Sequence, residues 1–319
     1  MDAPADLSPF ETLAVRADRG VLHVTLNRPA VRNAMSLRMI AELCDVLRRA
    51  EAAGDVRAIV LRGAAGHFCA GADLQDMAQA RQRELSGDTD AIAAVNARFG
   101  VLCDGFARTG IATVAVLEGT VMGGGLGLAC VVDAALAGQG AHFRLPETSL
   151  GIVPAQIAAF LVERVGASQA RRLAVTGGML DAAQAQAIGL VHEVHSDGPA
   201  LEAALAATLS QVLRCAPGAI AATKALMARA LHTPSADLIE DAARLFARAA
   251  RGPEGIEGMT AFRRSGRRRG RCNEPVLEYP RRQSWRRRAP SAGRGEATSR
   301  RARSARRRFR SGGDSCIRS

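Results

Sequence analysis

The chain has 319 residues, which is room for one large domain or two modest ones, and its net charge of +12 would suit a nucleic-acid-binding protein. The charge is uneven, however. Residues 263–319 contain 20 Arg, no Lys and 4 acidic residues, a net charge of +16, which leaves −4 for residues 1–262. The first 262 residues therefore do not form a basic protein, and a nucleic-acid partner is not expected.

The Arg-rich tail, residues 263–319, has almost no apolar periodicity and contains the only Trp and the only Tyr of the chain. Such a segment cannot bury enough apolar surface to offset the entropy lost on ordering, so we predict that it is disordered. Its arginines would suit an RNA-binding or membrane-binding arm, because guanidinium groups contact phosphates. An out-of-frame end of a GC-rich gene explains the abrupt change of composition at Arg263 better, and we interpret the tail as frameshift-derived.

Seven cysteines occur without a C-x-x-C pair and mostly in apolar runs, which indicates buried, reduced thiols in a cytosolic protein. The N-terminus lacks the basic and apolar regions of a signal peptide. The longest uncharged run, Thr148–Val162, is too short to span a bilayer. We therefore expect a cytoplasmic protein with no membrane partner. No metal is expected, because His192 and His195 have no third ligand nearby.

Strand and helix patterns alternate along the first part of the chain. Residues 22–26 alternate apolar and polar side chains, and Ser36 is placed to cap a helix with apolar residues at three- and four-residue spacing. Continuous apolar runs predict buried strands at residues 58–63, 113–117 and 132–136. This alternation predicts an α/β core, which we assign to residues 1–200.

After this core the strand patterns stop. Helical periodicity covers residues 201–213, 220–231 and 236–250, with proline in the breaks between them. We predict a C-terminal helical region over residues 201–262 that packs on the core or on a neighbouring subunit. The Arg-rich tail follows it.

The most informative local feature is the glycine-rich run Gly123–Gly127, which is typical of the start of a helix. It is not a dinucleotide fingerprint, because Leu128 stands where the third glycine would be, and no Gly-Lys-Ser/Thr follows for a P-loop. Backbone N–H groups at a helix start can instead bind one negative oxygen. The glycines are equally consistent with close packing of a strand against a helix.

A second turn of small residues, Ala70–Ala72, presents another backbone N–H at Ala72. Asp73 is placed to cap the next helix and is interpreted as structural. Two donors from different turns would form an oxyanion hole. Twenty residues after Gly127, Glu147 adds a carboxylate that can move a proton. This combination suggests chemistry on an enolate, the anion formed beside a polarised carbonyl.

Together these segments resemble the crotonase superfamily, the enoyl-CoA hydratase/isomerase family. The resemblance extends, in order and spacing, over roughly residues 10–262. Its motifs are Leu26–Pro29 with Asn33–Met35, Phe68–Leu74, Gly119–Asp133, Leu145–Ile152, Leu173–Gly178 and Ala187–Val191.

The resemblance implies a crotonase-like spiral of β-β-α units with a C-terminal helical oligomerisation region. It also implies homotrimers that often pair into hexamers, and an acyl-CoA substrate whose coenzyme A is the only cofactor-like group. It assigns the thioester oxygen to the N–H groups of Ala72 and Gly124, and the acid/base role to Glu147. The further expected substrate contacts are Ala70 and Gly71, whose turn would lie along coenzyme A, and Gly123 and Gln156.

One position departs from the family pattern, because Gly127 stands where hydratases of the family carry the first of two catalytic glutamates. Such a pair positions water and shuttles its proton, and glycine can do neither. Single-carboxylate relatives include Δ3,Δ2-enoyl-CoA isomerases, for which one base suffices. Residues 153–158, however, resemble bacterial isohexenylglutaconyl-CoA-type hydratases. We predict hydration of an α,β-unsaturated acyl-CoA, with isomerisation as the alternative and a non-catalytic RNA-binding protein that uses the tail as a second alternative.

Three polar residues near these motifs have plainer interpretations. Gln156 would hold a water in place of the missing carboxylate, or would only end a loop. Asp133 is interpreted as a structural cap. Lys224, the only lysine, is interpreted as a solvated charge.

Overall fold

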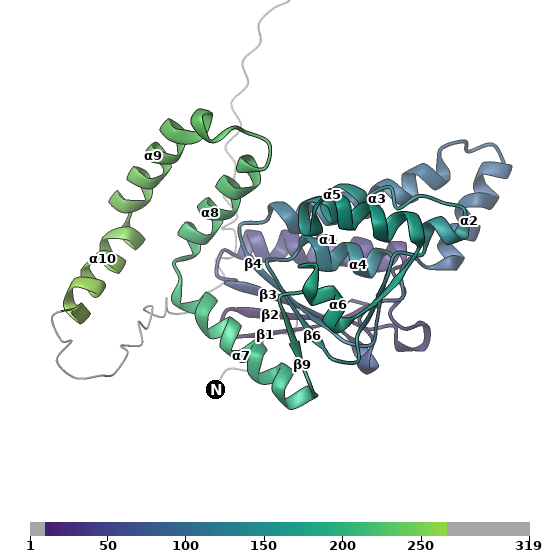
Figure 1. Cartoon of the computed structure of the whole chain (residues 1–319), viewed down its shortest axis with the longest axis horizontal. Helices are drawn as coiled ribbons and strands as arrows, with labels where there is room; N and C mark the ends of the chain where they lie inside the picture. Colours follow the sequence, from purple (N-terminus) through teal and green to yellow (C-terminus); the bar gives the residue numbers. More distant parts are fainter. Residues whose placement is uncertain (1–9, 267–319) are drawn as a thin grey trace, which may run out of the picture. The chain divides into compact units, whose positions relative to one another are not determined.

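The computed structural model describes residues 10–266, and its centre is a mixed six-stranded sheet (Figure 1). The strands lie in the order β1-β2-β3-β4-β6-β9, with β1 and β2 antiparallel and every other neighbouring pair parallel. Their bounds are β1 Leu13–Asp18, β2 Val21–Leu26, β3 Ala58–Gly63, β4 Ala112–Leu117, β6 Ala134–Gly138 and β9 Glu193–His195. Parallel strands joined by helical crossovers confirm the predicted α/β class.

Helices and short helical turns connect and cover the strands. The α-helices are α1 Leu37–Ala53, α2 Leu74–Leu85, α3 Ala91–Arg108, α4 Gly124–Val131, α5 Ala158–Thr176, α6 Ala182–Ala187, α7 Gly198–Arg214, α8 Pro217–Ala230, α9 Ser235–Arg251 and α10 Pro253–Gly266. The 3-10 turns of the described residues are η1 Pro29–Val31, η2 Ala64–Gly66 and η3 Glu147–Leu150. The predicted caps are confirmed, because Ser36 Oγ accepts from the Met39 N–H at 3.2 Å and Asp73 Oδ1 from the Gln75 N–H at 2.7 Å.

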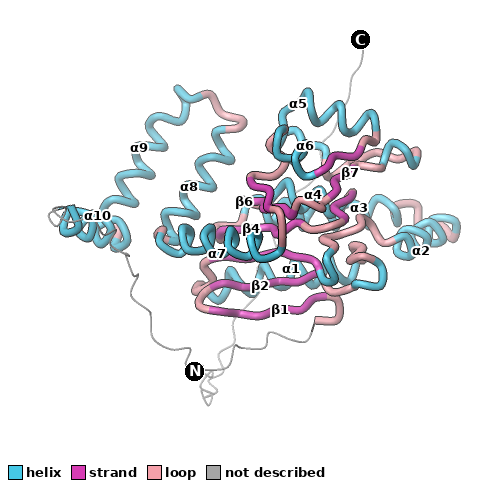
Figure 2. The backbone as a smooth tube through the Cα atoms, turned by 60° about the horizontal axis from the view of Figure 1, so that its bottom comes forward, coloured by secondary structure: helices cyan, strands magenta, loops and turns pink. Residues whose placement is uncertain are grey.

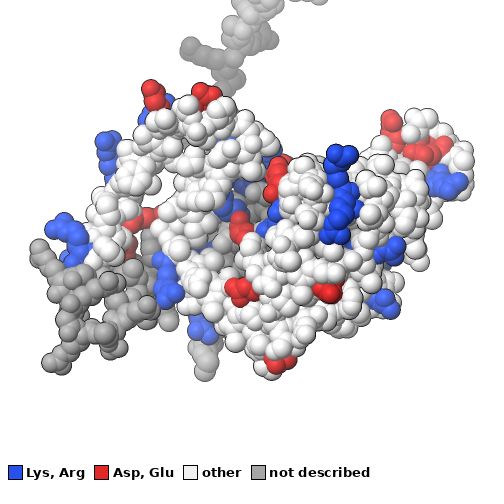
Figure 3. Space-filling model, in the orientation of Figure 1, with Lys and Arg blue, Asp and Glu red and all other residues white. Residues whose placement is uncertain are grey.

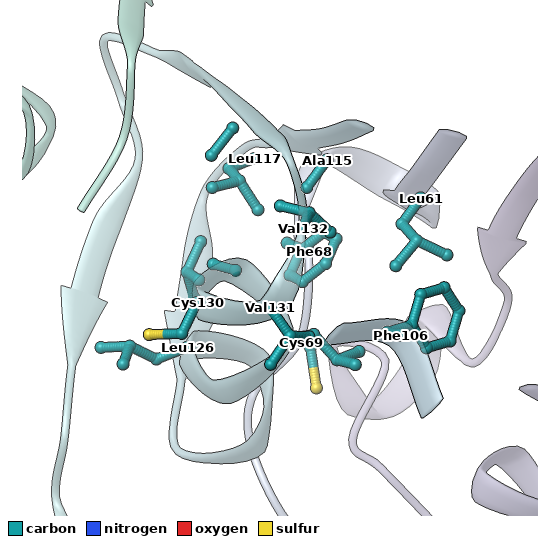
Figure 4. Close-up of a cluster of buried hydrophobic side chains, with 14 of the residues drawn as sticks. Leu61, Phe68, Cys69, Phe106, Ala115, Leu117, Leu126, Cys130, Val131 and Val132 are labelled. Atoms are coloured by element: carbon teal, nitrogen blue, oxygen red, sulfur yellow. The ribbon is translucent and has the colours of Figure 1, made fainter. Parts of the chain in front are cut away.

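Both faces of the central sheet are buried at its middle strands, β3 and β4. Alternate residues of a strand point to opposite faces, so Ile59 and Leu61 of β3 join the larger core whereas Val60 joins a smaller one with Leu201 and Leu205 of α7. Figure 4 shows part of the larger core around α4, including Leu61, Cys69 and Leu126. Burial on both sides explains why these strands read as continuous apolar runs.

A second, three-stranded sheet carries the segments on either side of the glycine-rich run. Strand β5 (Thr120–Met122) pairs in parallel with β7 (His142–Arg144), and β7 pairs antiparallel with β8 (Met179–Asp181). Met122 lies opposite Arg144 in this register. Because parallel strands end at the same edge, the residues that follow β5 and β7 emerge side by side.

One predicted strand is displaced. The apolar run suggested a strand at residues 132–136, but the structure places β6 at Ala134–Gly138, because α4 continues to Val131 and Val132 is its C-cap. A short apolar run does not distinguish the end of a buried helix from the beginning of a buried strand. Strands β5, β7, β8 and β9 were not predicted, because each has only three residues, too few to show a strand pattern.

The C-terminal region consists of α7, which packs on β3, β4 and β6, and of α8 and α9, which lie side by side (Figure 2). Helix α10 extends to Gly266, so the first four residues of the Arg-rich tail are helical rather than disordered. Arginine is a good helix former, which allows the helix to continue. The remaining residues of the tail, 267–319, lie outside the described part of the chain.

Lys224 connects α8 to the core, so the interpretation as a solvated charge is wrong. Its side chain is 14% exposed, and Nζ lies 2.7 Å from Asp133 Oδ2 and donates to the Ile111 carbonyl at 2.8 Å. Asp133 also accepts from the N–H of Thr113 at 2.7 Å. Asp133 therefore joins β4 to α8 instead of capping a helix.

Within residues 10–266, no single helix has the length and apolar character needed to cross a membrane. Helices α7 and α8 meet that test only together, as a pair bent by 99° at the break between them.

Candidate active site

Helix α4 begins at Gly124, directly after its N-cap Gly123, as the glycine-rich run predicts. Gly123 has a φ of 47°, in the left-handed region that favours glycine, so the chain turns sharply from β5 into the helix. The first turn of a helix has N–H groups without intrahelical acceptors and carries the positive end of the helix dipole. All eight residues of α4 are buried, which holds this donor end in place.

The turn Cys69–Ala72 lies against this helix start. The N–H of Cys69 donates to the Thr120 carbonyl at 2.9 Å, and the Cys69 carbonyl accepts from the Met122 N–H at 2.9 Å. Gly71 has a φ of 98°, and a Cβ atom added to it would lie 3.3 Å from the Met122 carbonyl oxygen. Backbone hydrogen bonds thus join the Cys69–Ala72 turn to the segment before α4, as they join neighbouring strands. Glycine at position 71 permits the close approach of the two backbones.

The backbone N–H groups of these turns are either engaged within the protein or available to a ligand. The engaged N–H groups are those of Ala70 (to the Arg32 carbonyl, 3.0 Å), Gly71 (to Cys69 Sγ, 3.4 Å) and Gly123 (to the Arg144 carbonyl, 3.1 Å). The N–H groups of Ala72 and Gly124 have no acceptor among residues 10–266. The available donors therefore include the two that the sequence analysis assigned to a thioester oxygen.

Two polar side chains from one loop position the Cys69–Ala72 turn. Arg28 Nη1 donates to Asp73 Oδ2 at 2.6 Å. The fully buried Asn33 donates through Nδ2 to the His67 carbonyl at 2.6 Å, and its Oδ1 accepts from the Arg28 N–H at 2.9 Å. Because these bonds fix both ends of the turn, they limit the movement of the Ala72 N–H.

Glu147 follows β7 and lies against the glycine-rich run. A Cβ atom added to Gly123 would lie 3.1 Å from Glu147 Oε1. Glu147 Oε2 is buried and has no hydrogen-bond partner within residues 10–266. Burial raises the pKa of Glu147 above its ordinary value, and only a hydrogen bond with its own backbone N–H acts in the opposite direction. Such a carboxylate is suited to take up and release a proton.

The space beside Gly127 is filled by apolar side chains. A Cβ atom added to Gly127 would lie 3.1 Å from Phe99 Cε1 and Cζ and 3.1 Å from Ile157 Cγ1. Phe99 also borders Gly124, whose added Cβ would lie 3.4 Å from the ring. An aromatic ring therefore packs at the position for which the resemblance implies the first of two catalytic glutamates.

Gln156 contacts helix α3 rather than only ending a loop. Its Nε2 donates to Asn96 Oδ1 at 2.9 Å, and its Oε1 lies where a Cβ atom on Gly100 would be only 2.2 Å away. Asn96, Phe99 and Gly100 lie on one face of α3, at three- and four-residue spacing. Asn96 and Phe99 are further candidate site residues. The sequence analysis did not name them, because no pattern places residues 75–99 relative to the glycine-rich run.

The other candidate reactive groups have structural partners. His192 accepts from the Ala135 N–H through Nδ1 at 2.9 Å, and within the described part of the chain no group of three or more His, Cys, Asp or Glu side chains is placed to bind a metal. Burial raises the pKa of Cys69 to about 11 and that of Cys130 to about 12. Both cysteines are therefore thiols rather than nucleophilic thiolates at neutral pH.

Replacing Gly125 by alanine is expected to destabilise the protein by about 1–3 kcal/mol through overpacking. The added Cβ would lie 2.8 Å from both the Cβ and the carbonyl oxygen of Cys69, and the backbone there cannot move without displacing the Cys69–Ala72 turn. Urea unfolding measures the loss. Gly127→Ala is the matched control in the same helix and should cost less, because its close neighbours are side chains. Equal stability of both variants with the wild type would contradict the close packing of the two turns.

Proteins with similar sequences and folds indicate the family of this chain. Residues 16–268 match the sequence profile of the enoyl-CoA hydratase/isomerase family. The chain is 32% identical over 251 residues to 2,3-dehydroadipyl-CoA hydratase of Escherichia coli K12, covering 78% of this chain and 94% of that one. Among solved structures it resembles an enoyl-CoA hydratase/isomerase from Marinobacter aquaeolei (48% identity, TM-score 0.76) and Pseudomonas aeruginosa AtuE (51% identity, TM-score 0.77), each covering 80% of this chain and 97% of the other.

The chain belongs to the enoyl-CoA hydratase/isomerase family and has the crotonase fold. It is accordingly an enzyme of the acyl-CoA hydratase type. The match covers nearly the whole described part of the chain and confirms the resemblance predicted from the sequence motifs.

Proposed function

We propose that the protein hydrates an α,β-unsaturated acyl-CoA. The observation that carries the proposal is the pair of backbone N–H groups, from Ala72 and Gly124, that have no acceptor within residues 10–266. The raised-pKa carboxyl of Glu147 lies against Gly123, the residue before Gly124. The two donors bind the thioester oxygen and stabilise the enolate that forms on it. Ala70, Gly71 and the other residues of that turn border coenzyme A.

A single carboxylate carries the proton through both steps of the reaction. The water oxygen attacks the β-carbon, the electron pair of the double bond moves onto the thioester oxygen as an enolate, and the water proton passes to Glu147. The protonated Glu147 then returns that proton to the α-carbon, which collapses the enolate to the thioester. One molecule of water is added in total, and Glu147 ends in its starting form.

The second candidate is Δ3,Δ2-enoyl-CoA isomerisation, which the apolar packing beside Gly127 favours. Phe99 and Ile157 fill the space beside Gly127, where a second carboxylate would hold the water. In an isomerase Glu147 would remove a proton from the α-carbon and return it to the γ-carbon, with the same two N–H groups stabilising the dienolate. The similarity of residues 153–158 to isohexenylglutaconyl-CoA-type hydratases supports hydration instead.

Purified protein supplied with 2-enoyl-CoA and 3-enoyl-CoA esters, including branched glutaconyl-type esters, distinguishes the two reactions. We expect the absorbance of the conjugated enoyl thioester to disappear from the 2-enoyl substrates as water adds. Appearance of that absorbance from the 3-enoyl substrates, without loss from the 2-enoyl ones, would assign isomerisation instead.

We also propose that the protein works as a homotrimer or hexamer. Apolar side chains are exposed along α8 and α9, including Met227 (66% exposed), Ile239 (67%) and Phe246 (75%). Much of the face seen in Figure 3 carries neither basic nor acidic side chains. Neighbouring subunits would cover the exposed apolar side chains of α8 and α9. Sedimentation at the mass of a single chain would contradict the proposal.

A further inference from the structure

An amide pair is formed by the same two segments that fill the apolar space beside Gly127. Gln156 follows Pro154 and precedes Ile157, whose Cγ1 is one of the atoms closest to a Cβ added at Gly127. Asn96 lies one helical turn before Phe99 on α3, and Phe99 is the other close neighbour. The Asn96–Gln156 pair and Phe99 are therefore contributed by the same two segments.

The hydrogen bond between the amides leaves one donor and one acceptor. Gln156 Nε2 donates to Asn96 Oδ1 at 2.9 Å, so Gln156 Oε1 and Asn96 Nδ2 are the groups not used in that bond. Neither has another partner within residues 10–266. Both side chains are half-buried, which keeps them accessible to a small polar molecule.

Gly100 makes room for this arrangement. A Cβ atom on Gly100 would lie 2.2 Å from Gln156 Oε1 and 2.8 Å from its Cδ, so any larger residue would push the amide away from α3. Glycine in the interior of a helix costs about 1 kcal/mol of stability relative to alanine. The glycine that accommodates Gln156 therefore lowers the intrinsic stability of α3.

Resting on the proposed hydration, we propose that the Asn96–Gln156 pair holds the attacking water in place of the missing second carboxylate. Gln156 Oε1 accepts one hydrogen of the water and Asn96 Nδ2 donates to its oxygen. Amides do not ionise, so the pair takes no proton, and the water proton passes to Glu147 as described above. Phe99 and Ile157 keep other water away from the β-carbon.

Three variants test the pair. Gln156→Leu removes the amide at similar volume, Asn96→Ala removes its partner, and Gly100→Ala displaces the amide without changing it and should stabilise α3. Gln82→Leu, at an exposed amide on α2, is the control. We expect each site variant to lower kcat for hydration ~10- to 100-fold, the size of effect that misplacement of a reactant by about 1 Å can have.

Exchange of the α-proton of a saturated acyl-CoA in deuterated water provides the second readout, because it needs Glu147 and the two N–H groups but no attacking water. The proposal predicts that exchange falls far less than hydration in all three variants, so that the ratio of exchange to hydration rises ~10- to 100-fold. Equal loss of exchange and hydration, unchanged hydration, or a raised KM with unchanged kcat would each overturn it. If the wild-type protein exchanged the proton but hydrated no enoyl-CoA, the proposed hydration itself would fail, and with it the role of the pair.

Discussion

Replacement of Gly124 by proline is expected to lower kcat for hydration ~10²- to 10³-fold with little loss of stability. The substitution removes the backbone N–H that has no acceptor among residues 10–266 and that we assign to the thioester oxygen. One such donor supplies about 2.7–4 kcal/mol of transition-state stabilisation. Steady-state kinetics on the preferred 2-enoyl-CoA measure the loss.

The fold should tolerate this change because Gly124 is the first residue of α4. Proline is favoured at the first helical position, where the N–H has no intrahelical acceptor and the fixed φ of the ring suits the helix. A Cβ atom at position 124 would lie 3.4 Å from the Phe99 ring and 3.9 Å from Met35 Cβ, which are ordinary contact distances. Thermal unfolding of the variant checks this expectation.

Gly124→Ala is the matched control, because it adds the same Cβ atom and keeps the N–H. We expect its kcat to stay close to that of the wild type. If the alanine variant lost as much activity as the proline variant, the cause would be crowding against Phe99, and the assignment of the Gly124 N–H would be wrong.

The parts of the site that could be predicted from the sequence are those carried by local backbone structure. Gly123 and Gly124 indicate the start of a helix because glycine suits the left-handed N-cap, and Asp73 indicates the next helix through its capping side chain. The motif around Glu147 placed a carboxylate near them through the family resemblance. These features depend on a few consecutive residues, so the sequence alone suffices.

The parts that could not be predicted depend on contacts between distant segments. Gln156 meets Asn96 across 60 residues of sequence, and Lys224 meets Asp133 across 91. Phe99 has the apolar character of any core residue, and no local pattern says that it fills the space beside Gly127. Spacing on one helix shows which residues share a face, but not what that face contacts.

Replacement of Glu147 by glutamine is expected to lower kcat ~10²- to 10⁴-fold, the usual contribution of a general acid or base. Glutamine has nearly the same shape but cannot carry the proton between water and the α-carbon. Hydration and α-proton exchange should both fall to the same degree, which separates Glu147 from the Asn96–Gln156 pair, where hydration should fall far more than exchange. Retention of either activity near the wild-type rate would contradict the acid/base role.

The same variant is expected to be more stable than the wild type at pH 7, by about 0.5–2 kcal/mol, a usual range for single stabilising substitutions. Burial raises the folded-state pKa of Glu147 above its unfolded value of about 4.3. The protonated carboxyl of Glu147 therefore contributes fully to the free energy of unfolding below the unfolded-state pKa. This contribution is lost as the pH rises through the folded-state pKa. Glutamine does not ionise, so the difference in urea stability should appear at pH 7 and vanish near pH 4.

The raised pKa also determines the acidic side of the pH–rate profile. Because Glu147 must be ionised to accept the water proton, kcat/KM for hydration should fall as the pH drops through the folded-state pKa, above the ordinary range of a glutamate. Among residues 10–266 the carboxyl has no charged partner, and the main cause of the shift is burial, so added salt should move the midpoint little. A midpoint of the pH–rate profile at or below the ordinary glutamate pKa would contradict this expectation. It would mean that the Glu147 carboxylate is solvated, and not buried, in the form of the enzyme that reacts.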